Sequence, residues 1–206
     1  MNQKALYCIS YGLFVLTARQ GQKDNGCMIN TAMQLTSTPN RLGVTVNKAN
    51  ATHDMVLETR KFTVSVLSKK ANFDLIRRFG FQSGREINKF QDYEYAKRNQ
   101  EGMLYVTEGT NAFLSVEVEE TIDLGTHTMF IGNVTEMEAL DSESSATYEY
   151  YQTYIKPRPG AAKAKRGQTV WRCKVCGYEY TGEELPDDFI CPVCKHPASD
   201  FERVEE

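Results

Sequence analysis

The stretch Cys173-Lys174-Val175-Cys176, followed by Cys191-Pro192-Val193-Cys194, organises the end of this chain. Residues 177–190 separate the two Cys-x-x-Cys pairs. Two residues between cysteines let both sulfurs of a pair converge on one ion, so the pairs together predict a single four-thiolate metal site. Such a tetrahedral thiolate set suits zinc, and it equally suits a single iron.

Aromatic residues around the cysteines help to choose between these metals. The simpler interpretation is a zinc ribbon, in which the metal only stabilises a small fold. However, the span 171–201 holds enough aromatic side chains to shield a metal from water, namely Trp171, Tyr178, Tyr180, Phe189 and Phe201. Solvent exclusion and N–H···S hydrogen bonds set the potential of an iron–thiolate centre, so this composition favours iron.

The cysteine module resembles rubredoxin, a one-electron carrier with one iron on four cysteines. The resemblance covers residues 170–203 and rests on the run Cys-x-x-Cys-Gly-Tyr-x-Tyr followed by Cys-Pro-Val-Cys. It implies that Cys173, Cys176, Cys191 and Cys194 bind the iron. The spacer between the pairs is short, as in the compact rubredoxin modules of rubrerythrins. Lys195 stands where rubredoxins usually have glycine.

The rest of the 206-residue chain has the composition of an ordinary globular protein, with 41% hydrophobic and 25% charged residues. The cysteine module leaves room for a separate core upstream. We therefore expect a first domain at 1–155, a Pro- and Lys-rich linker at 156–167 and a metal domain at 168–206. No signal peptide or membrane span is visible, and the cysteine usage fits a reducing compartment, so a cytoplasmic location is expected.

Charge is distributed unevenly along the chain. Residues 167–206 hold four basic and nine acidic side chains, a net charge of −5, whereas residues 156–166 hold five basic and no acidic ones. Nucleic-acid affinity depends on neutralising phosphates, so an acidic module argues against nucleic acid as a partner. The same surface is suited to steering towards a basic protein partner.

Apolar alternation in residues 1–155 predicts a β-rich α+β domain, most simply a closed or partly closed barrel. Helices are expected from Asn50 or Thr52 to Thr59, from Asn72 to just before Gly80, and in a short piece at 86–90. A turn is expected at 21–26 and an aromatic exit segment at 148–154. The expected strands are 11–19, 27–35, 41–47, 62–67, 102–108, 111–122 and 127–139. No Walker loop or Gly-x-Gly-x-x-Gly follows a strand, which argues against a Rossmann domain.

Polar segments that interrupt the apolar ones hold the candidate chemistry: residues 25–34, 47–53, 79–85 with Lys89, and 125–132. The loop 47–53 could hold a phosphate, because Lys48 precedes a helix whose free N–H groups and positive dipole end face the same anion. Taken alone, such a loop is more often a helix cap. Similarly, His53 and His127 taken singly are more often structural than catalytic.

Together these segments resemble the flavin reductase-like family, whose split barrel binds FMN at a homodimer interface. The resemblance covers residues 5–155. It implies that the isoalloxazine and ribityl chain lie against Asn30, Thr31, Ala32 and Gln34. It assigns the phosphate end to Asn47, Lys48, Thr52 and His53, with Arg85 and Lys89 nearby. His127 is expected beside the flavin and is the candidate catalytic residue.

A flavin domain joined to a rubredoxin module resembles the high-molecular-weight rubredoxins of anaerobic microbes. The resemblance implies electron transfer from NADH or NADPH through FMN and iron to a flavodiiron protein that reduces nitric oxide or dioxygen. Nicotinamide delivers two electrons together and a single iron accepts one, so FMN must lie between them.

Two alternatives stay open at the level of sequence. The chain could be a flavin reductase that supplies reduced flavin to a monooxygenase, with a structural zinc knuckle, and an iron-free module would favour this. It could instead be a non-catalytic binding module whose zinc ribbon recruits a partner or nucleic acid, although the net charge of −5 on residues 167–206 argues against nucleic acid. A colourless purified protein would favour the second alternative.

Overall fold

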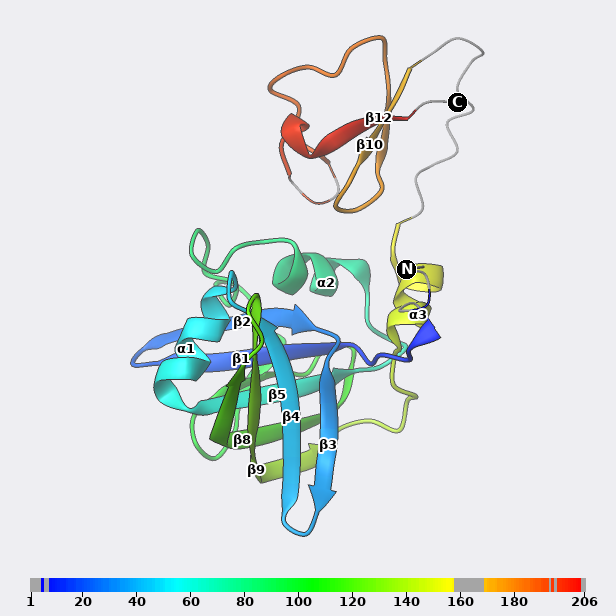
Figure 1. The fold of residues 1–206 in the computed structure, drawn as a ribbon. Coiled ribbons are helices and arrows are strands. Elements are labelled where there is room, and N and C mark those ends of the chain that lie inside the picture. The colour runs from blue at the N-terminus through cyan, green and yellow to red at the C-terminus, as the bar shows by residue number, and fades with distance from the viewer. Residues whose placement is uncertain (1–4, 6–7, 158–168, 193, 195, 205–206) are drawn as a thin grey trace. The chain divides into compact units, whose positions relative to one another are not determined.

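The computed structural model describes residues 5, 8–157, 169–192, 194 and 196–204. The chain divides into two compact units, Met1–Gln152 and Thr153–Glu206 (Figure 1). From residue 158 onward the predicted linker lies outside the described residues, as does Lys195. The domain limits expected at 155 and 168 stay predictions. No helix in the described part of the chain is long and apolar enough to cross a membrane.

An antiparallel seven-stranded sheet in the order β2-β1-β5-β8-β9-β4-β3 forms the first unit. Its strands are β1 (Phe14–Gln20), β2 (Lys23–Ile29), β3 (Ala32–Ser37), β4 (Asn40–Asn47), β5 (Lys61–Leu67), β8 (Thr110–Asp123) and β9 (His127–Ala139). β6 (Ala96–Arg98) and β7 (Leu104–Val106) pair separately. This confirms the predicted β-rich fold.

Asn30 and Thr31 alone separate β2 from β3, the two edge strands of this sheet. Two residues span less than about 10 Å, so the edges must approach one another at this point. Register shifts at Ser115/Val116 and Val118/Glu120 mark bulges where the long β8–β9 pair bends. The sheet therefore curls into a partly closed barrel.

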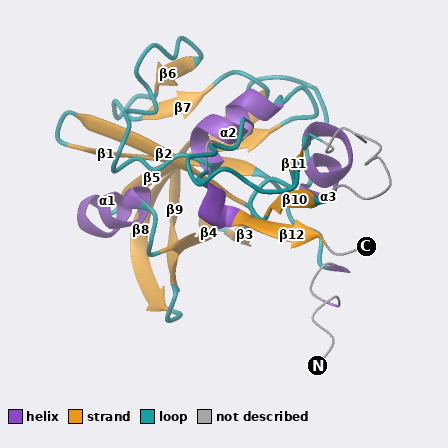
Figure 2. Cartoon of the chain, turned by 90° about the horizontal axis from the view of Figure 1, so that it is seen from above, coloured by secondary structure: helices purple, strands orange, loops and turns teal. Residues whose placement is uncertain are grey.

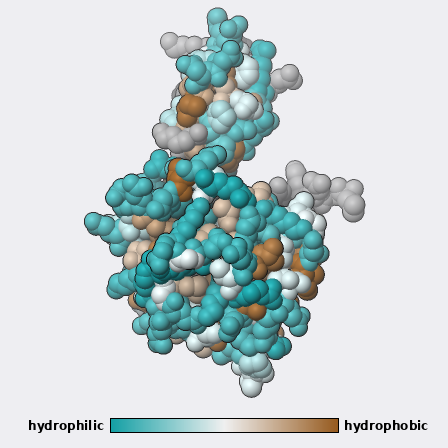
Figure 3. All heavy atoms as spheres, turned by 90° about the vertical axis from the view of Figure 1, so that its left-hand side faces the viewer, coloured by the Kyte–Doolittle hydropathy of each residue, from teal (hydrophilic) through white to brown (hydrophobic). Residues whose placement is uncertain are grey.

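The barrel interior is apolar because alternate residues of each strand point inward. Val44, Val46, Phe62 and Val64, placed by alternation, are all buried in the core cluster. Helix α1 (Ala51–Thr59) contacts β1 and β2, and its Met55 and Val56 side chains join the core cluster, whereas α2 (Phe73–Gly80) contacts β2 (Figure 2). The face in Figure 3 is mainly hydrophilic, with small separate apolar patches.

Both predicted helix starts are confirmed, with different cap chemistry. Asn72 accepts a hydrogen bond from the N–H of Leu75 at 2.9 Å, whereas the Asn50 side chain makes no capping hydrogen bond. α1 ends at Arg60, which adopts φ 57°. α2 includes Gly80, one residue beyond the expected end.

Three local predictions are wrong. The turn expected at 21–26 is shorter, because Lys23–Gly26 continue β2 and pair with β1 despite their polarity. The strand expected at 27–35 breaks at Asn30, where the chain crosses between sheet edges. Residues 86–90 form turns instead of a helix. The exit segment forms a short helix, α3 (Tyr148–Tyr150), followed by a π-helical turn, Tyr151–Ile155.

The second unit contains a three-stranded sheet in the order β11-β10-β12. Its strands are β10 (Val170–Cys173), β11 (Glu179–Thr181) and β12 (Phe201–Val204). Phe201 pairs with Cys173 across the sheet, and its ring meets that of Phe189 edge-on at 5.4 Å. The small core thus consists of aromatic rings beside buried cysteines.

Candidate functional site

The four cysteine thiols of the second unit converge on one point. Their sulfur atoms all lie within 4.8 Å of one another, and each residue is at most 1% exposed. The Sγ atoms of Cys173 and Cys194 are 3.6 Å apart, and those of Cys176 and Cys191 are 3.5 Å apart. Four sulfurs ~2.3 Å from a tetrahedral ion lie about 3.8 Å from one another. The cluster therefore fits a single metal ion.

Two similar backbone knuckles build this cluster. The Cys173 N–H donates to the Tyr178 carbonyl, and the Cys191 N–H donates to the His196 carbonyl, both at 2.8 Å. Gly177 takes φ 80° in the first knuckle, a conformation that glycine adopts without a Cβ clash. The backbone N–H groups of Tyr178 and His196 hydrogen-bond to the sulfurs of Cys176 and Cys194. Such N–H···S bonds orient the ligands and stabilise thiolates.

Burial opposes ionisation of these thiols. It raises the pKa of Cys176 to about 11, and it raises the pKa of Cys194 further. A metal ion must therefore displace the protons, which couples metal binding to proton release.

A cavity of about 340 Å³ in the first unit brings together four residues predicted for the flavin. Asn30, Thr31, Asn47 and His127 line it together with Met28, Ile29, Thr45, Asn50 and Leu124. Asn47 and His127 are direct partners across the β4–β9 pair. The sequence signals from three separate segments thus meet in one hollow.

A second cavity, of about 850 Å³, adjoins the first because Asn30 lines both. Its other lining residues are Cys8, Ile9, Ser10, Tyr11, Thr147, Tyr148, Glu149 and Gln152. Sequence reasoning did not assign these residues to a site. The aromatic run at 148–154 was a signal, but nothing in its pattern connected it with Asn30.

The start of α1 has features that suit an anion. Asn50 does not cap the helix with its side chain, and the buried hydroxyl of Thr52 in the first turn lies beside the Cys27 thiol. Helix N-termini attract phosphates through free N–H groups and the positive dipole end. This helix start, which follows Asn47 and Lys48 directly, fits the phosphate of FMN.

His53 is hydrogen-bonded within the protein through both ring nitrogens. Its Nδ1 lies 2.9 Å from Asp54, and its Nε2 lies 2.9 Å from the Thr128 hydroxyl. Asp54 also accepts a hydrogen bond from Arg85 at 2.7 Å, and both neighbours hold the pKa of this carboxyl below its usual range, His53 foremost. Both ring nitrogens of His53 are therefore engaged, and Arg85 is directed towards Asp54.

Lys89 does not line either cavity. It is 3% exposed, and burial lowers the pKa of its ammonium to about 8. The remaining predicted residues lie on β3, where Ala32 pairs with Val44 and exposed Gln34 hydrogen-bonds weakly to the Thr36 carbonyl at 3.3 Å.

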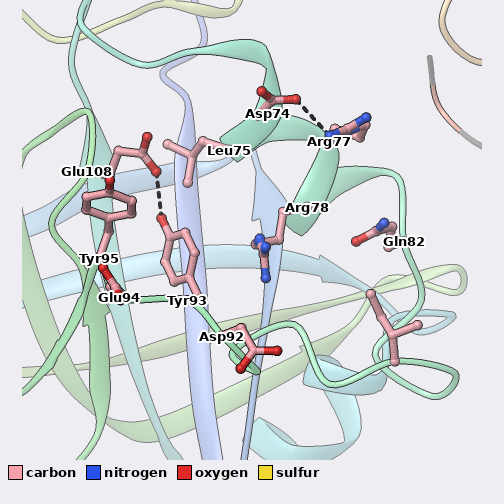
Figure 4. A pocket seen from close by; sticks show the side chains of 11 residues that line it. Asp74, Leu75, Arg77, Arg78, Gln82, Asp92, Tyr93, Glu94, Tyr95 and Glu108 are labelled. Carbon is pink, nitrogen blue, oxygen red and sulfur yellow. Dashed lines mark hydrogen bonds and ion pairs between the residues drawn. The ribbon is translucent and has the colours of Figure 1, made fainter. Parts of the chain in front are cut away.

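A third cavity, of about 470 Å³, lies beside α2 and contains no predicted site residue (Figure 4). Its polar groups largely satisfy one another. The Tyr93 hydroxyl donates to Glu108 at 3.2 Å, and Arg77 pairs with Asp74 at 2.8 Å. The Arg78 guanidinium lies 5.0 Å from the centre of the Tyr93 ring. This internal pairing is that of a structural polar cluster.

Comparison with known proteins agrees with this geometry. Residues 6–157 match the flavin reductase like domain family, and residues 171–202 match the rubrerythrin, rubredoxin-like domain family. The chain therefore belongs to the flavin reductase-like family of oxidoreductases and carries a C-terminal rubredoxin-like domain with a four-cysteine site typical of rubredoxin iron.

Two relatives cover most of this chain. The high molecular weight rubredoxin of Moorella thermoacetica is 35% identical over 99% of this chain and 100% of its own length, so the two proteins share their domain organisation. The ferric-chelate reductase (NAD(P)H) of Archaeoglobus fulgidus is 37% identical over 83% of this chain and 98% of its own length.

Solved structures share the fold at low sequence identity. The FMN-binding protein of Thermus thermophilus superimposes with a TM-score of 0.58 at 23% identity, covering 74% of this chain and 80% of its own. An NADH:FAD oxidoreductase of Streptomyces globisporus superimposes with a TM-score of 0.62 at 20% identity, covering 70% of this chain and 85% of its own. The predictions of a flavin reductase fold and a rubredoxin-like domain are thus confirmed.

Proposed function

We propose that this chain takes a hydride from NADH or NADPH onto FMN and passes the electrons singly through an Fe(Cys)4 centre to a protein acceptor. The observation that carries the proposal is the presence, in one chain, of a flavin reductase domain and a buried four-thiolate cluster. FMN supplies the conversion between two-electron and one-electron chemistry, and a four-cysteine iron carries one electron at a time.

Residues of the first unit would hold the flavin by its two ends. Asn47, Lys48 and Thr52 surround the start of α1 and would bind the phosphate. Asn30 and Thr31 line the adjoining cavity and would contact the ring system and ribityl chain, with Ala32 and Gln34 continuing along β3. His127 lines the same cavity, which supports its position beside the flavin.

The larger cavity is our proposed site for the nicotinamide nucleotide. It adjoins the flavin cavity through Asn30, and its volume of about 850 Å³ leaves room for a second ring system. Tyr11 and Tyr148 provide aromatic walls that favour planar rings. Binding here would bring donor and acceptor rings close without a protein acid or base.

A flavodiiron protein is the proposed acceptor, and a homodimer is the proposed assembly. The resemblance to high-molecular-weight rubredoxins supports both. The net charge of −5 on residues 167–206 supports docking to a basic surface on the acceptor.

The test separates hydride uptake from onward transfer. Aerobically purified protein should contain equimolar iron and FMN. In Cys194→Ser, NADH or NADPH should bleach FMN at close to the wild-type rate under anaerobic stopped-flow conditions, while reduction of a flavodiiron acceptor should collapse. Stoichiometric zinc in protein produced with ample iron would instead support a flavin reductase with a structural knuckle. Unimpaired acceptor reduction by the variant would remove the iron from the path.

A further inference from the structure

The turn between β8 and β9 is fixed to the loop that precedes α1. The backbone N–H of Lys48 donates to the Thr126 carbonyl at 3.0 Å. The ammonium of the same residue lies 2.7 Å from Asp123 Oδ1. That oxygen also accepts a hydrogen bond from the Gly125 N–H at 2.8 Å, which fixes the carboxylate at the end of the turn.

This turn borders the flavin cavity. Leu124, the residue after Asp123, lines the cavity together with Asn47 and Asn50. The Lys48 and Asp123 side chains are 37% and 72% exposed, so solvent and ligands can reach the pair. The Lys48 hydrogen bond holds the pKa of the Asp123 carboxyl below its usual range, so this carboxylate is charged at neutral pH.

We propose that Asp123 determines how strongly the protein retains phosphorylated flavin, by competing with the FMN phosphate for the Lys48 ammonium. The inference rests on the proposed function, because it takes Lys48 as a phosphate ligand. A carboxylate and a phosphate repel each other, and both cannot approach one ammonium without cost. Riboflavin lacks the phosphate, so its binding should leave the ion pair between Lys48 and Asp123 intact.

The decisive variant is Asp123→Asn in the full-length protein. Asparagine keeps an oxygen for the Gly125 N–H and removes only the charge. Exposed ion pairs are weak, so FMN affinity should rise by about two- to fivefold, with riboflavin affinity unchanged. Flavin titrations of the flavin-depleted protein, followed by fluorescence quenching, give both dissociation constants.

A matched control lies elsewhere in the same unit. Asp141 pairs with Lys70 at 2.6 Å and accepts the N–H of Glu143, two residues further on, just as Asp123 accepts that of Gly125. Asp141→Asn removes the same kind of charge away from the cavity. It should leave both flavin affinities unchanged.

A double-mutant cycle assigns the effect to Lys48. Lys48→Ala should weaken FMN binding without affecting riboflavin. Adding Asp123→Asn should then give a smaller gain than in the wild-type background, because only the direct repulsion between carboxylate and phosphate is left to relieve. The contradicting outcome is that Lys48→Ala weakens FMN binding while Asp123→Asn has no effect, or changes riboflavin affinity equally. In either case Asp123 does not compete with the phosphate, and the proposed phosphate site stands. If Lys48→Ala leaves FMN binding unchanged, Lys48 is not a phosphate ligand and the proposed site itself fails.

Discussion

The ammonium of Lys89 is buried and lies 3.1 Å from the carbonyl oxygen of Phe79, in the last turn of α2. The same nitrogen donates to the Gly26 carbonyl in β2 at 2.9 Å. One side chain therefore ties the loop after α2 to both the helix end and the barrel. A cation is favourable at a helix C-terminus, and a buried ammonium needs such acceptors.

Lys89→Met should change how stability depends on pH. The unfolded chain has a lysine pKa near 10.4, whereas the folded protein lowers the pKa of Lys89 to about 8. Between these values the unfolded state binds more protons, so this group makes the protein more stable as pH rises. In the wild type, this group should raise the free energy of unfolding by about 2 kcal/mol between pH 8 and 10, and the variant should lack this increase. Urea unfolding followed by circular dichroism measures it.

The comparison with wild type is needed because Cys27 has the opposite effect. Burial raises the pKa of this thiol from 9.0 to about 11, so it lowers the stability with rising pH between these values, a range that overlaps that of Lys89. Cys27 is present in both proteins, and its contribution largely cancels in the difference. Equal pH dependence of the variant and wild type would show that Lys89 is not desolvated as described.

Gly132→Ala should destabilise the barrel by about 2–4 kcal/mol. A methyl group at this position would clash with the carbonyl oxygen of Glu117 in β8 and lie 2.8 Å from Val116 Cγ1. The backbone of β8 cannot move aside without disrupting its hydrogen bonds with the neighbouring strands. Gly43→Ala is the control, because its methyl would meet the flexible ends of Leu35 and Met129 at 3.0 and 3.1 Å. Similar unfolding midpoints in urea for both variants would rule out this explanation.

Thr128→Val should lower the free energy of unfolding by about 1–3 kcal/mol, because it leaves the buried Nε2 of His53 without its partner. Valine has nearly the same shape, so little packing is lost. Thr128→Ser keeps the hydroxyl and should restore most of the hydrogen bond. Nitrogen chemical shifts of the imidazole report the bond directly. A shift unchanged in the valine variant would contradict the contact.

Cys176→Ser should abolish tetrahedral metal binding and unfold the second unit while the first unit remains folded. Without the ion, the three remaining thiols no longer cross-link the two knuckles, and the few aromatic rings form too small a core to hold the sheet together. Trp171 is the only tryptophan, so its fluorescence reports this unit alone. Circular dichroism should retain the unfolding transition of the barrel. Loss of both signals together would show that the units depend on one another.

The four-cysteine cluster and most of the barrel strands could be predicted from the amino-acid sequence alone. Each Cys-x-x-Cys pair is a local structure whose short spacing already brings two sulfurs together, so Cys173 and Cys176 needed no tertiary information. Apolar alternation placed Val44 and Phe62 in the core for the same reason, since side-chain direction along a strand follows from backbone geometry.

The contacts of the polar residues, in contrast, depend on how distant strands are brought together. Lys48 and Asp123 are separated by 75 positions, and so are His53 and Thr128. Strand order sets these pairings, and a polar side chain carries no periodic signal that reveals its partner. The pattern of loop 47–53 could therefore suggest an anion site, whereas the pairing of Lys48 with Asp123 follows only from the packing of β9 beside β4.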